Sequence, residues 1–351
     1  MKIALVTDTH FGARNDNQNV NDYFYKFYDN VFFPELEKRG VKTCVHLGDV
    51  VDRRKFISFK IANDFRNRFI NRFAELGIDL HIIIGNHDTY YKNTNEVNSM
   101  EELVGKDRCN IYTGPEVVEF DGVPIQFIPW INASNYDESM TALSRSPAQI
   151  AMGHLEVNGF EMHKGHFADG AYDKELFRRF DIVMSGHFHH KSDDGQIYYL
   201  GTPYEIYWSD FEDPRGFHIF DTETRELERI VNPYHLFEKI YYDDTTTDYT
   251  DYDMSKFKDM YVKVIVVNKK DLYQFDKFVD QLLQADAHEV KIIEDFSELD
   301  AENVSDDIVE NAEDTMTLLE KYIDELDVTM DKDRLKNTMR SLYTEAQDLE
   351  L

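Results

Sequence analysis

The sequence predicts an α/β fold in which strands and helices form layers. Apolar segments typical of buried strands alternate with segments whose apolar residues recur every three or four positions, as in helices. Five of the apolar segments end in polar residues that can bind a metal, and the carboxyl ends of parallel strands commonly carry such chemistry. These five segments are IALVTDTH (3–10), CVHLGDVVD (44–52), LHIIIGNHD (80–88), IAMGHLE (150–156) and IVMSGHFHH (182–190).

The remaining elements follow from periodicity and from residues that end a helix or form a turn. We expect an aromatic-rich helix over residues 20–33 that ends at Pro34, and a helix over 57–76 whose apolar residues are spaced by three or four. A hairpin over 117–130 should turn at Asp121-Gly122. The other expected elements are strands at 2–6 and 41–47, a short helix within 95–104, and closing strands at 198–204 and 216–224.

Changes in composition divide the chain into three parts. Residues 1–237 hold all five motifs, and residues 238–297 contain a compact βαβ pattern over 259–295. Within the second part, before the βαβ pattern, residues 242–253 lack apolar periodicity and carry five acidic residues, so we expect a linker or an exposed loop there. Residues 298–351 hold 17 acidic and 5 basic residues, a net charge of −12, and two amphipathic helical patterns. Such apolar seams favour a partner surface, although packing on their own domain is an equal alternative.

The composition excludes several classes of protein. A net charge of −30 argues against a chain that grips nucleic acid over its whole surface, but it leaves room for a local basic track. Two cysteines give no disulfide framework and fit a reducing compartment. No apolar run reaches membrane-spanning length, and the first strand starts at Lys2, so we expect neither a membrane anchor nor a secretory leader. A cytoplasmic location follows, or the host cytoplasm if a phage encodes the chain.

The strand ends supply carboxylates, imidazoles and one amide oxygen, with no thiolate. The candidate metal ligands are Asp8, His10, Asp49, Asn86, His154, His187 and His189. This donor set suits two divalent cations of borderline hardness, such as manganese, iron or zinc, and not a structural zinc site. Two such cations can activate a water and bind the oxygens of a phosphoryl centre. The expected reaction is therefore phosphoester hydrolysis.

The motifs DTH, GDVVD, GNHD, GH and GHFH, in this order, resemble the five signatures of the calcineurin-like metallophosphoesterases. The resemblance implies a layered β-sandwich with flanking helices. It also implies one metal held by Asp8, His10 and His189, a second held by Asn86, His154 and His187, and Asp49 between them. The catalytic residues would be His87, which assists the leaving oxygen, and Asp52, which hydrogen-bonds that histidine.

Residues 1–235 further resemble the SbcD-type nuclease subunits of DNA-repair complexes, in particular the recombination endonuclease subunits of T4-type phages. The resemblance lies in GHLEVNGF, in GHFHHKSDDGQIYYLGTPY and in DPRGFHIFDTET. It implies a manganese-dependent DNA exonuclease and endonuclease that acts as a homodimer. It also implies an SMC-like ATPase partner bound by the C-terminal helices, and a DNA-guiding role for the small α/β domain as a cap.

Two surfaces have candidate residues. Arg53, Arg54 and Lys55 can contact DNA phosphates, with a solvated charged face as the commoner alternative. The resemblance also implies dimer contacts at Ile57, Ile61, Phe65, Val97 and Met100, and for the helix over 57–76 packing on its own sheet is the alternative. Two other functions stay open: a phosphatase for phosphoproteins or small phosphomonoesters, because Arg53 coincides with a phosphatase arginine, and a scaffold that mainly tethers the ATPase.

Overall fold

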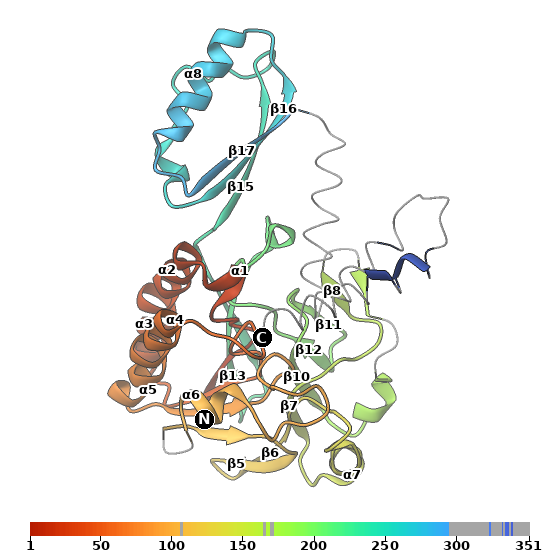
Figure 1. Ribbon diagram of the computed structural model, residues 1–351. Helices are drawn as coiled ribbons and strands as arrows, with labels where there is room; N and C mark the ends of the chain where they lie inside the picture. Colours follow the sequence, from red (N-terminus) through yellow and green to blue (C-terminus); the bar gives the residue numbers. More distant parts are fainter. Residues whose placement is uncertain are drawn as a thin grey trace. The chain divides into compact units, whose positions relative to one another are not determined.

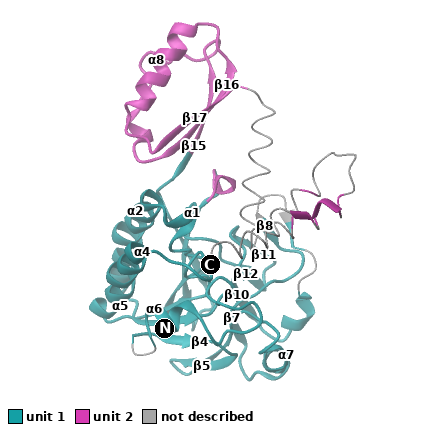
Figure 2. Cartoon of the chain, viewed as in Figure 1, with its two compact units in different colours: residues 1–206, 212–237 teal, residues 207–211, 238–351 magenta. Residues whose placement is uncertain are grey.

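The computed structural model describes residues 1–105, 108–163, 166–168 and 172–294, together with a few isolated positions between 323 and 339. The chain forms two compact units, shown in separate colours in Figure 2. Unit 1 comprises residues 1–206 and 212–237, and unit 2 comprises residues 207–211 and 238–351. Nearly all of the two tail helices expected over residues 298–351 lies outside the described residues.

Figure 1 shows the ribbon of the chain, coloured along the sequence. The first sheet of unit 1 has six strands in the order β14-β13-β1-β2-β3-β4. Its strands are β1 (Lys2–Val6), β2 (Thr43–His46), β3 (Asp79–Ile83), β4 (Asn110–Tyr112), β13 (Gly216–Asp221) and β14 (Leu227–Val231). Strands β1 to β4 are parallel, whereas β13 is antiparallel to both of its neighbours. The carboxyl ends of β1, β2 and β3, which carry three of the five motifs, therefore meet at one edge.

The second sheet has the order β11-β12-β10-β7-β6-β5. Its strands are β5 (Glu116–Phe120), β6 (Val123–Ile128), β7 (Ile150–His154), β10 (Ile182–Gly186), β11 (Ser192–Asp193) and β12 (Ile197–Tyr199). The four central strands are parallel, so the motifs after β7 and β10 also share an edge. The expected hairpin is confirmed: Phe120 pairs with Val123 across Asp121 and Gly122, whose φ values are +53° and +79°. A separate two-stranded ribbon pairs β8 (Glu161–His163) with β9 (His166–Phe167).

The two large sheets pack face to face, and helices flank them. Ile3, Leu5 and Val45 of the first sheet share a buried core with Phe127 and Met152 of the second. This arrangement confirms the expected layered β-sandwich with flanking helices. The helices of unit 1 are α1 (Ala13–Asp16), α2 (Gln18–Phe27), α3 (Phe33–Arg39), α4 (Phe59–Asp64), α5 (Asn71–Leu76), α6 (Ser99–Leu103) and α7 (Tyr136–Arg145), the π-helical segments η1 (Tyr28–Phe32) and η2 (Phe65–Ile70), and the 3-10 turn η3 (Lys174–Phe177).

The sequence predicts that the first long helix ends at Pro34, and this prediction is wrong. The helix continues through α2, η1 and α3 to Arg39. Pro34 lies in the first turn of α3, directly after the π-helical turn η1. A proline has no N–H to donate and its ring crowds the preceding turn, and a wider π-helical turn at that point accommodates both effects. The expectation failed because it treated proline as a stop and not as a local change of helical pitch.

The second long helix, α4–η2–α5, confirms the expected helix over 57–76 and also corrects the predicted dimer contacts. Ile61 and Phe65 are each 1% exposed, and Met100 of α6 is fully buried, so these three side chains pack within unit 1. Phe65 stacks on Phe69 with ring centroids 5.7 Å apart. Burial within the chain, and not exposure to a second copy, describes these three residues.

Unit 2 is a small α/β unit with the strand order β15-β16-β17. Its elements are β15 (Phe237–Asp243), η5 (Ser255–Phe257), β16 (Tyr261–Asn268), α8 (Leu272–Leu283) and β17 (Glu289–Ile293), and the short turn η4 (Trp208–Asp210) belongs to it by contacts. Strands β16 and β17 are parallel and joined by α8, so the expected βαβ pattern is confirmed. The expected linker over 242–253 is instead partly core, because Tyr242 is fully buried and stacks on Tyr249 at 4.4 Å. Among the described residues, no helix is both long and apolar enough to cross a membrane.

Candidate metal centre

Most predicted ligands lie in loops after the strands, and His154 is the last residue of β7. Asp8, His10, Asp49 and His187 all have positive φ values, of +51°, +44°, +54° and +91°. A non-glycine residue pays a conformational cost in this region, and such residues cluster at functional sites where the surrounding fold holds them. The loops therefore present their side chains in one direction at the expense of local backbone strain.

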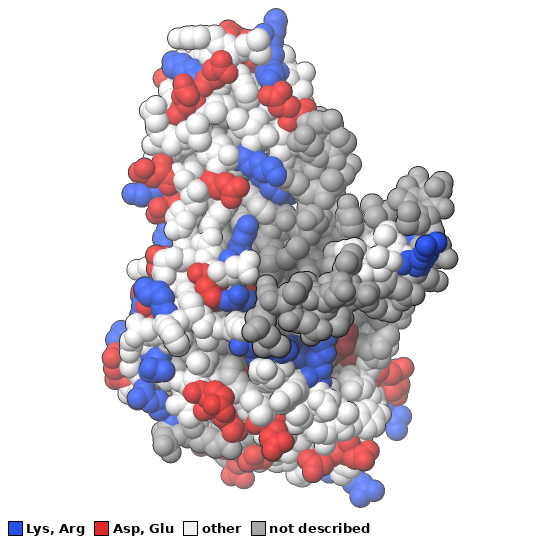
Figure 3. Space-filling view, viewed as in Figure 1, with Lys and Arg blue, Asp and Glu red and all other residues white. Residues whose placement is uncertain are grey.

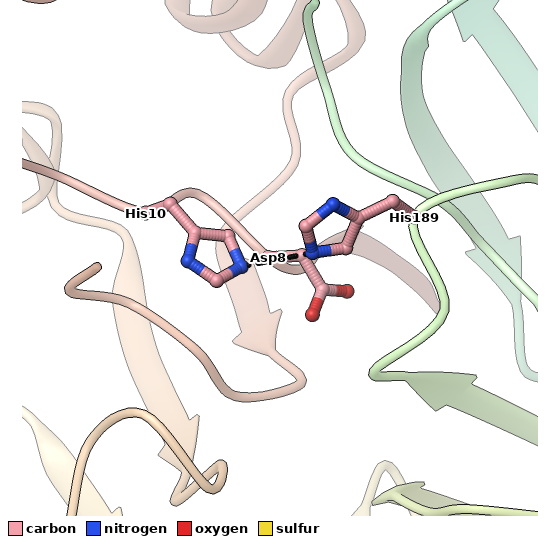
Figure 4. A group of neighbouring side chains, drawn as sticks. All are labelled: Asp8, His10 and His189. Carbon is pink, nitrogen blue, oxygen red and sulfur yellow. Dashed lines mark hydrogen bonds between the residues drawn. The ribbon is translucent and has the colours of Figure 1, made fainter. Parts of the chain in front are cut away.

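A first group of donors consists of Asp8, His10 and His189 (Figure 4). The Nε2 atoms of His10 and His189 lie 3.1 Å apart, although the two residues are separated by 179 positions in the chain. The N–H of His187 donates to both carboxylate oxygens of Asp8, at 3.1 Å each. This bond ties the loop after β10 to the loop after β1 and keeps the carboxylate in place.

A second group is formed by Asn86, His154 and His187. Asn86 Oδ1 lies 2.9 Å from Nε2 of His154 and 3.0 Å from Nδ1 of His187. The other ring nitrogen of His154, Nδ1, lies 2.8 Å from the Leu47 carbonyl and must donate to it. Nε2 of His154 is then the nitrogen that faces the amide oxygen of Asn86, and it can bind a metal when it carries no proton.

Asp49 lies between the two groups. Its Oδ2 atom is 3.3 Å from Nε2 of His154 and 3.9 Å from Nε2 of His10, so one carboxylate oxygen reaches both. The atoms of Asp49, His154 and His187 that can bind a metal lie within 4.8 Å of one another. Carboxylate, imidazole and amide donors this close to one another suit divalent metals of borderline hardness. The residues present therefore fit two divalent ions.

The electrostatics of the centre follow from burial and close charges. Burial raises the pKa of Asp8. Burial opposes ionisation of Asp49 too, but His154 and His87 outweigh it and hold the pKa of Asp49 well below its usual range. Burial likewise disfavours a charged His154, yet the Asp49 carboxylate beside it raises the pKa of His154 to about 9. Burial and the neighbouring His154 hold the pKa of His187 well below its usual value.

The predicted pair of Asp52 and His87 differs from the expectation. His87 Nδ1 contacts the backbone carbonyl of Asp52, whereas the Asp52 carboxylate lies 3.4 Å from Nδ1 of His10. The reason is the path of the loop, because the N–H of Asp52 donates to the Phe11 carbonyl at 3.1 Å and so places Asp52 beside the first motif. Asp52 thus supports a metal ligand through its side chain and orients His87 through its backbone.

Sequence reasoning named Asp88 only as a polar residue of the third motif and missed its role. Its carboxylate is fully buried and accepts four backbone N–H groups, from Gly85 and Asp49 on one oxygen and from Val50 and Val51 on the other. These bonds fasten the loop after β2 to the loop after β3. The signal in the sequence is an aspartate directly after two ligand-capable residues at the end of a buried strand.

A glycine permits the close approach of the same two loops. A Cβ atom added to Gly85 would lie 2.2 Å from Oδ1 of Asp49, closer than real side-chain atoms come. The glycine of the third motif is therefore required by the position of the shared carboxylate.

The three basic residues proposed to contact DNA already have partners within the chain. Arg53 forms an ion pair with Asp16, and Arg54 donates to Oγ1 of Thr89 at 3.4 Å. Nζ of Lys55 lies 5.3 Å from the ring centre of Tyr90. On the face seen in Figure 3, basic and acidic side chains are interspersed. The described surface on this face therefore has mixed charge.

The predicted dimer contacts that are not buried have apolar neighbours. Val97 is 40% exposed and Ile57 is half-buried. Beside Ile57 in the chain, Phe56 and Phe59 are 70% and 95% exposed. Large exposed apolar side chains mark an interaction surface where they form a contiguous patch. In these stretches the exposed apolar side chains include Phe56 and Phe59, which the helical pattern did not select.

The chain is similar to several known proteins. A family model for calcineurin-like phosphoesterases matches residues 1–191. The chain is 33% identical over 352 residues to "Exonuclease subunit 1" of Enterobacteria phage T4, which covers 99% of both chains. It is 24% identical over 260 residues to a subunit of the nuclease SbcCD of Staphylococcus epidermidis, which covers 65% of this chain and 67% of that protein. A solved structure of an archaeal phosphodiesterase aligns with 66% of this chain and 100% of its own at 15% identity, with a TM-score of 0.32.

The chain therefore belongs to the calcineurin-like phosphoesterase family, whose members use divalent metals, and it is a phosphoesterase. Within this family it is similar along its whole length to a nuclease subunit of a T4-type phage, as its motifs predict.

Proposed function

We propose that this chain is the nuclease subunit of a DNA-processing complex and hydrolyses phosphodiesters of DNA with two divalent metal ions, for which manganese is the proposed metal. The observation that carries the proposal is the pair of donor groups that share Asp49, with the half-buried His87 beside them. Similarity over 99% of the chain to a phage exonuclease subunit supports DNA as the substrate. The work of such a complex is DNA end processing in recombination, repair and replication.

The residues divide the task. One ion would be held by Asp8, His10 and His189, the second by Asn86, His154 and His187, with Asp49 shared. When bound, the ions supply Lewis acidity and an activated water at the phosphorus. The protein's part is to hold these donors in place at the ends of the strands, four of them at positive φ, so that little rearrangement is needed when the substrate arrives.

His87 is the proposed proton donor or charge stabiliser for the leaving oxygen. The backbone N–H of His87 donates to Oδ1 of Asp49 at 2.8 Å, and the ring centre of His87 lies 5.0 Å from that of His10 in an edge-on arrangement. Because the Asp52 carbonyl accepts from Nδ1, Nε2 is the nitrogen left for proton transfer to the substrate. A second hydrogen-bond partner fixes a histidine's tautomer in this way.

The assembly is also a proposal. The exposed Phe56, Phe59 and Val97 support a homodimer contact beside the predicted Ile57. The acidic helices of residues 298–351 are the proposed attachment to an SMC-like ATPase, and the small α/β domain, residues 238–297, is the proposed cap that guides DNA. Because the chain has a net charge of −30, partner subunits would supply much of the positive potential that DNA requires.

The test is hydrolysis of linear DNA by the purified chain with and without manganese. We expect metal-dependent cleavage that is abolished in His87→Gln, while the manganese bound per chain stays unchanged. His81→Gln is the matched control, because that histidine lies on β3 and contacts the hydroxyl of Tyr112 at 2.8 Å. A His87→Gln chain that cuts at the parental rate would reject the mechanism. Fast turnover of a chromogenic phosphomonoester with inert DNA would reject the substrate.

A further inference from the structure

We infer that Trp130 forms a stacking subsite for an unpaired nucleobase beside the metal centre. The inference rests on the proposed DNA nuclease function and deepens it, because it names the part of the substrate that one side chain contacts. Trp130 follows strand β6 and is absent from the five motifs.

The position of the indole carries the inference. Its ring centre lies 5.1 Å from that of His187 and 6.1 Å from that of His154, the two imidazoles of the second donor group. His154 is fully buried, whereas Trp130 is partly exposed. A partly exposed aromatic residue thus lies directly beside the ligands at which a phosphodiester would be bound.

The backbone of Trp130 is fixed on both sides. Its N–H donates to the Ile84 carbonyl at 2.8 Å. Its carbonyl accepts from Nδ2 of Asn95 at 2.9 Å and from Nδ2 of Asn135 at 3.0 Å. Both asparagines are buried. The side chain therefore starts from a fixed point, and a rigid aromatic group loses little entropy when a ligand packs on it.

A nucleobase is the chemical group that fits this position. Every base has a π-face, so an aromatic platform binds DNA without a sequence preference. Such a contact adds affinity without cationic side chains, which matters for a chain with a net charge of −30. The faces of a paired base are covered by its neighbours in the duplex, so the base on Trp130 must come from a single-stranded or frayed end.

The chain has two tryptophans, which allows a direct optical test. Trp208 belongs to unit 2 and lies 4.3 Å from Nζ of Lys263, so a Trp208→Phe chain leaves Trp130 as the only indole. Single-stranded oligonucleotides are added to this variant in a buffer that contains calcium ions in place of manganese. Binding is measured separately by the fluorescence anisotropy of a labelled strand. We expect the emission of Trp130 to be quenched in step with binding. An abasic strand of equal length should bind without this quenching.

Affinity gives the second readout. Trp130→Ala should bind an ordinary single strand roughly tenfold more weakly, as expected for the loss of one stacked base, and an abasic strand as before. Trp130→Phe should keep most of the affinity. Manganese binding, followed by calorimetry, should be unchanged in both variants.

Three results would overturn the inference and leave the nuclease assignment intact: binding without quenching, an equal loss of affinity for both strands, or loss of manganese binding in Trp130→Phe. The last result would make Trp130 a support for His187 only. Failure of the unaltered chain to bind or cut any DNA would instead refute the proposed function.

Discussion

Replacement of Asp88 by asparagine should both destabilise unit 1 and weaken metal binding. The carboxylate accepts two backbone N–H groups on each oxygen, at 2.9 to 3.2 Å. An amide can accept at only one of the two positions, so two buried donors lose their acceptor whichever way it points. Each buried unpaired donor costs about 1–3 kcal/mol, so the free energy of unfolding should fall by about 2–6 kcal/mol.

The loss of metal affinity follows from which loop is released. Two of the four bonds go to the N–H groups of Asp49 and Val50, and Asp49 is the carboxylate shared by both donor groups. Removal of a residue that orients a metal ligand typically weakens binding about 10- to 100-fold. We therefore expect a manganese affinity at least about tenfold weaker, measured by calorimetry at pH 8, alongside urea unfolding in a chelator.

The matched control is Asp64→Asn on α4. Asp64 is also buried and accepts from Nδ2 of Asn21 at 3.1 Å, but it belongs to the helix layer. This variant should lose stability and keep its manganese affinity. The reasoning fails if Asp88→Asn unfolds like the unaltered chain, or if it loses stability while binding manganese as tightly as before.

Two further predictions concern Asp52 and His218. The Asp52 carboxylate faces His10 and not His87. Asp52→Asn should therefore weaken manganese binding about tenfold and leave the pH dependence of the rate unchanged. A shifted pH dependence with unchanged manganese affinity would instead support the pairing of Asp52 with His87 that the sequence predicts. Burial lowers the pKa of His218 to about 3, whereas the pKa of an unfolded histidine is about 6.5. Below pH 6.5 the unfolded chain therefore binds a proton that the folded chain does not bind, and the free energy of unfolding falls as the pH drops through about 6.5. His218→Gln should therefore remove about 1.4 kcal/mol of the stability difference between pH 7.5 and 5.5, measured by urea unfolding in a chelator, and an unchanged slope would contradict this account.

The sequence predicted the strand ends and the donor residues because both depend on local patterns. A buried strand must be apolar, and its polar end stands out, so Asp8, Asn86 and His187 could be found without any knowledge of the partners they meet. The roles of Asp52 and Asp88 depend on how one loop runs beside another. No periodicity encodes that path, and it became visible only in the backbone bonds between the loops.

The helices illustrate the same limit. A spacing of three and four predicts that Ile61 and Phe65 share a face, but it does not say whether that face meets the chain's own sheet or a second copy. The exposed Phe56 and Phe59 lie at or just before the start of α4, where the periodic pattern carries no information. Burial decides between the two uses, and it is a property of the assembled layers.

Removal of metal should leave this protein folded, because the centre is held by its scaffold and not by the ion. The core between the two sheets is apolar and buried, and the ligand loops are tied by hydrogen bonds that involve no metal. However, Asp8, Asp49 and Asp88 are all buried close to one another, and cations relieve their repulsion. We therefore expect a single cooperative melt in chelator, a Tm that rises with manganese concentration at pH 8, and a smaller rise near pH 6, where protons compete for the donors. Unfolding on chelation alone would mean that the metal forms the site, as it does in small zinc domains, and would contradict a centre preorganised by two sheets.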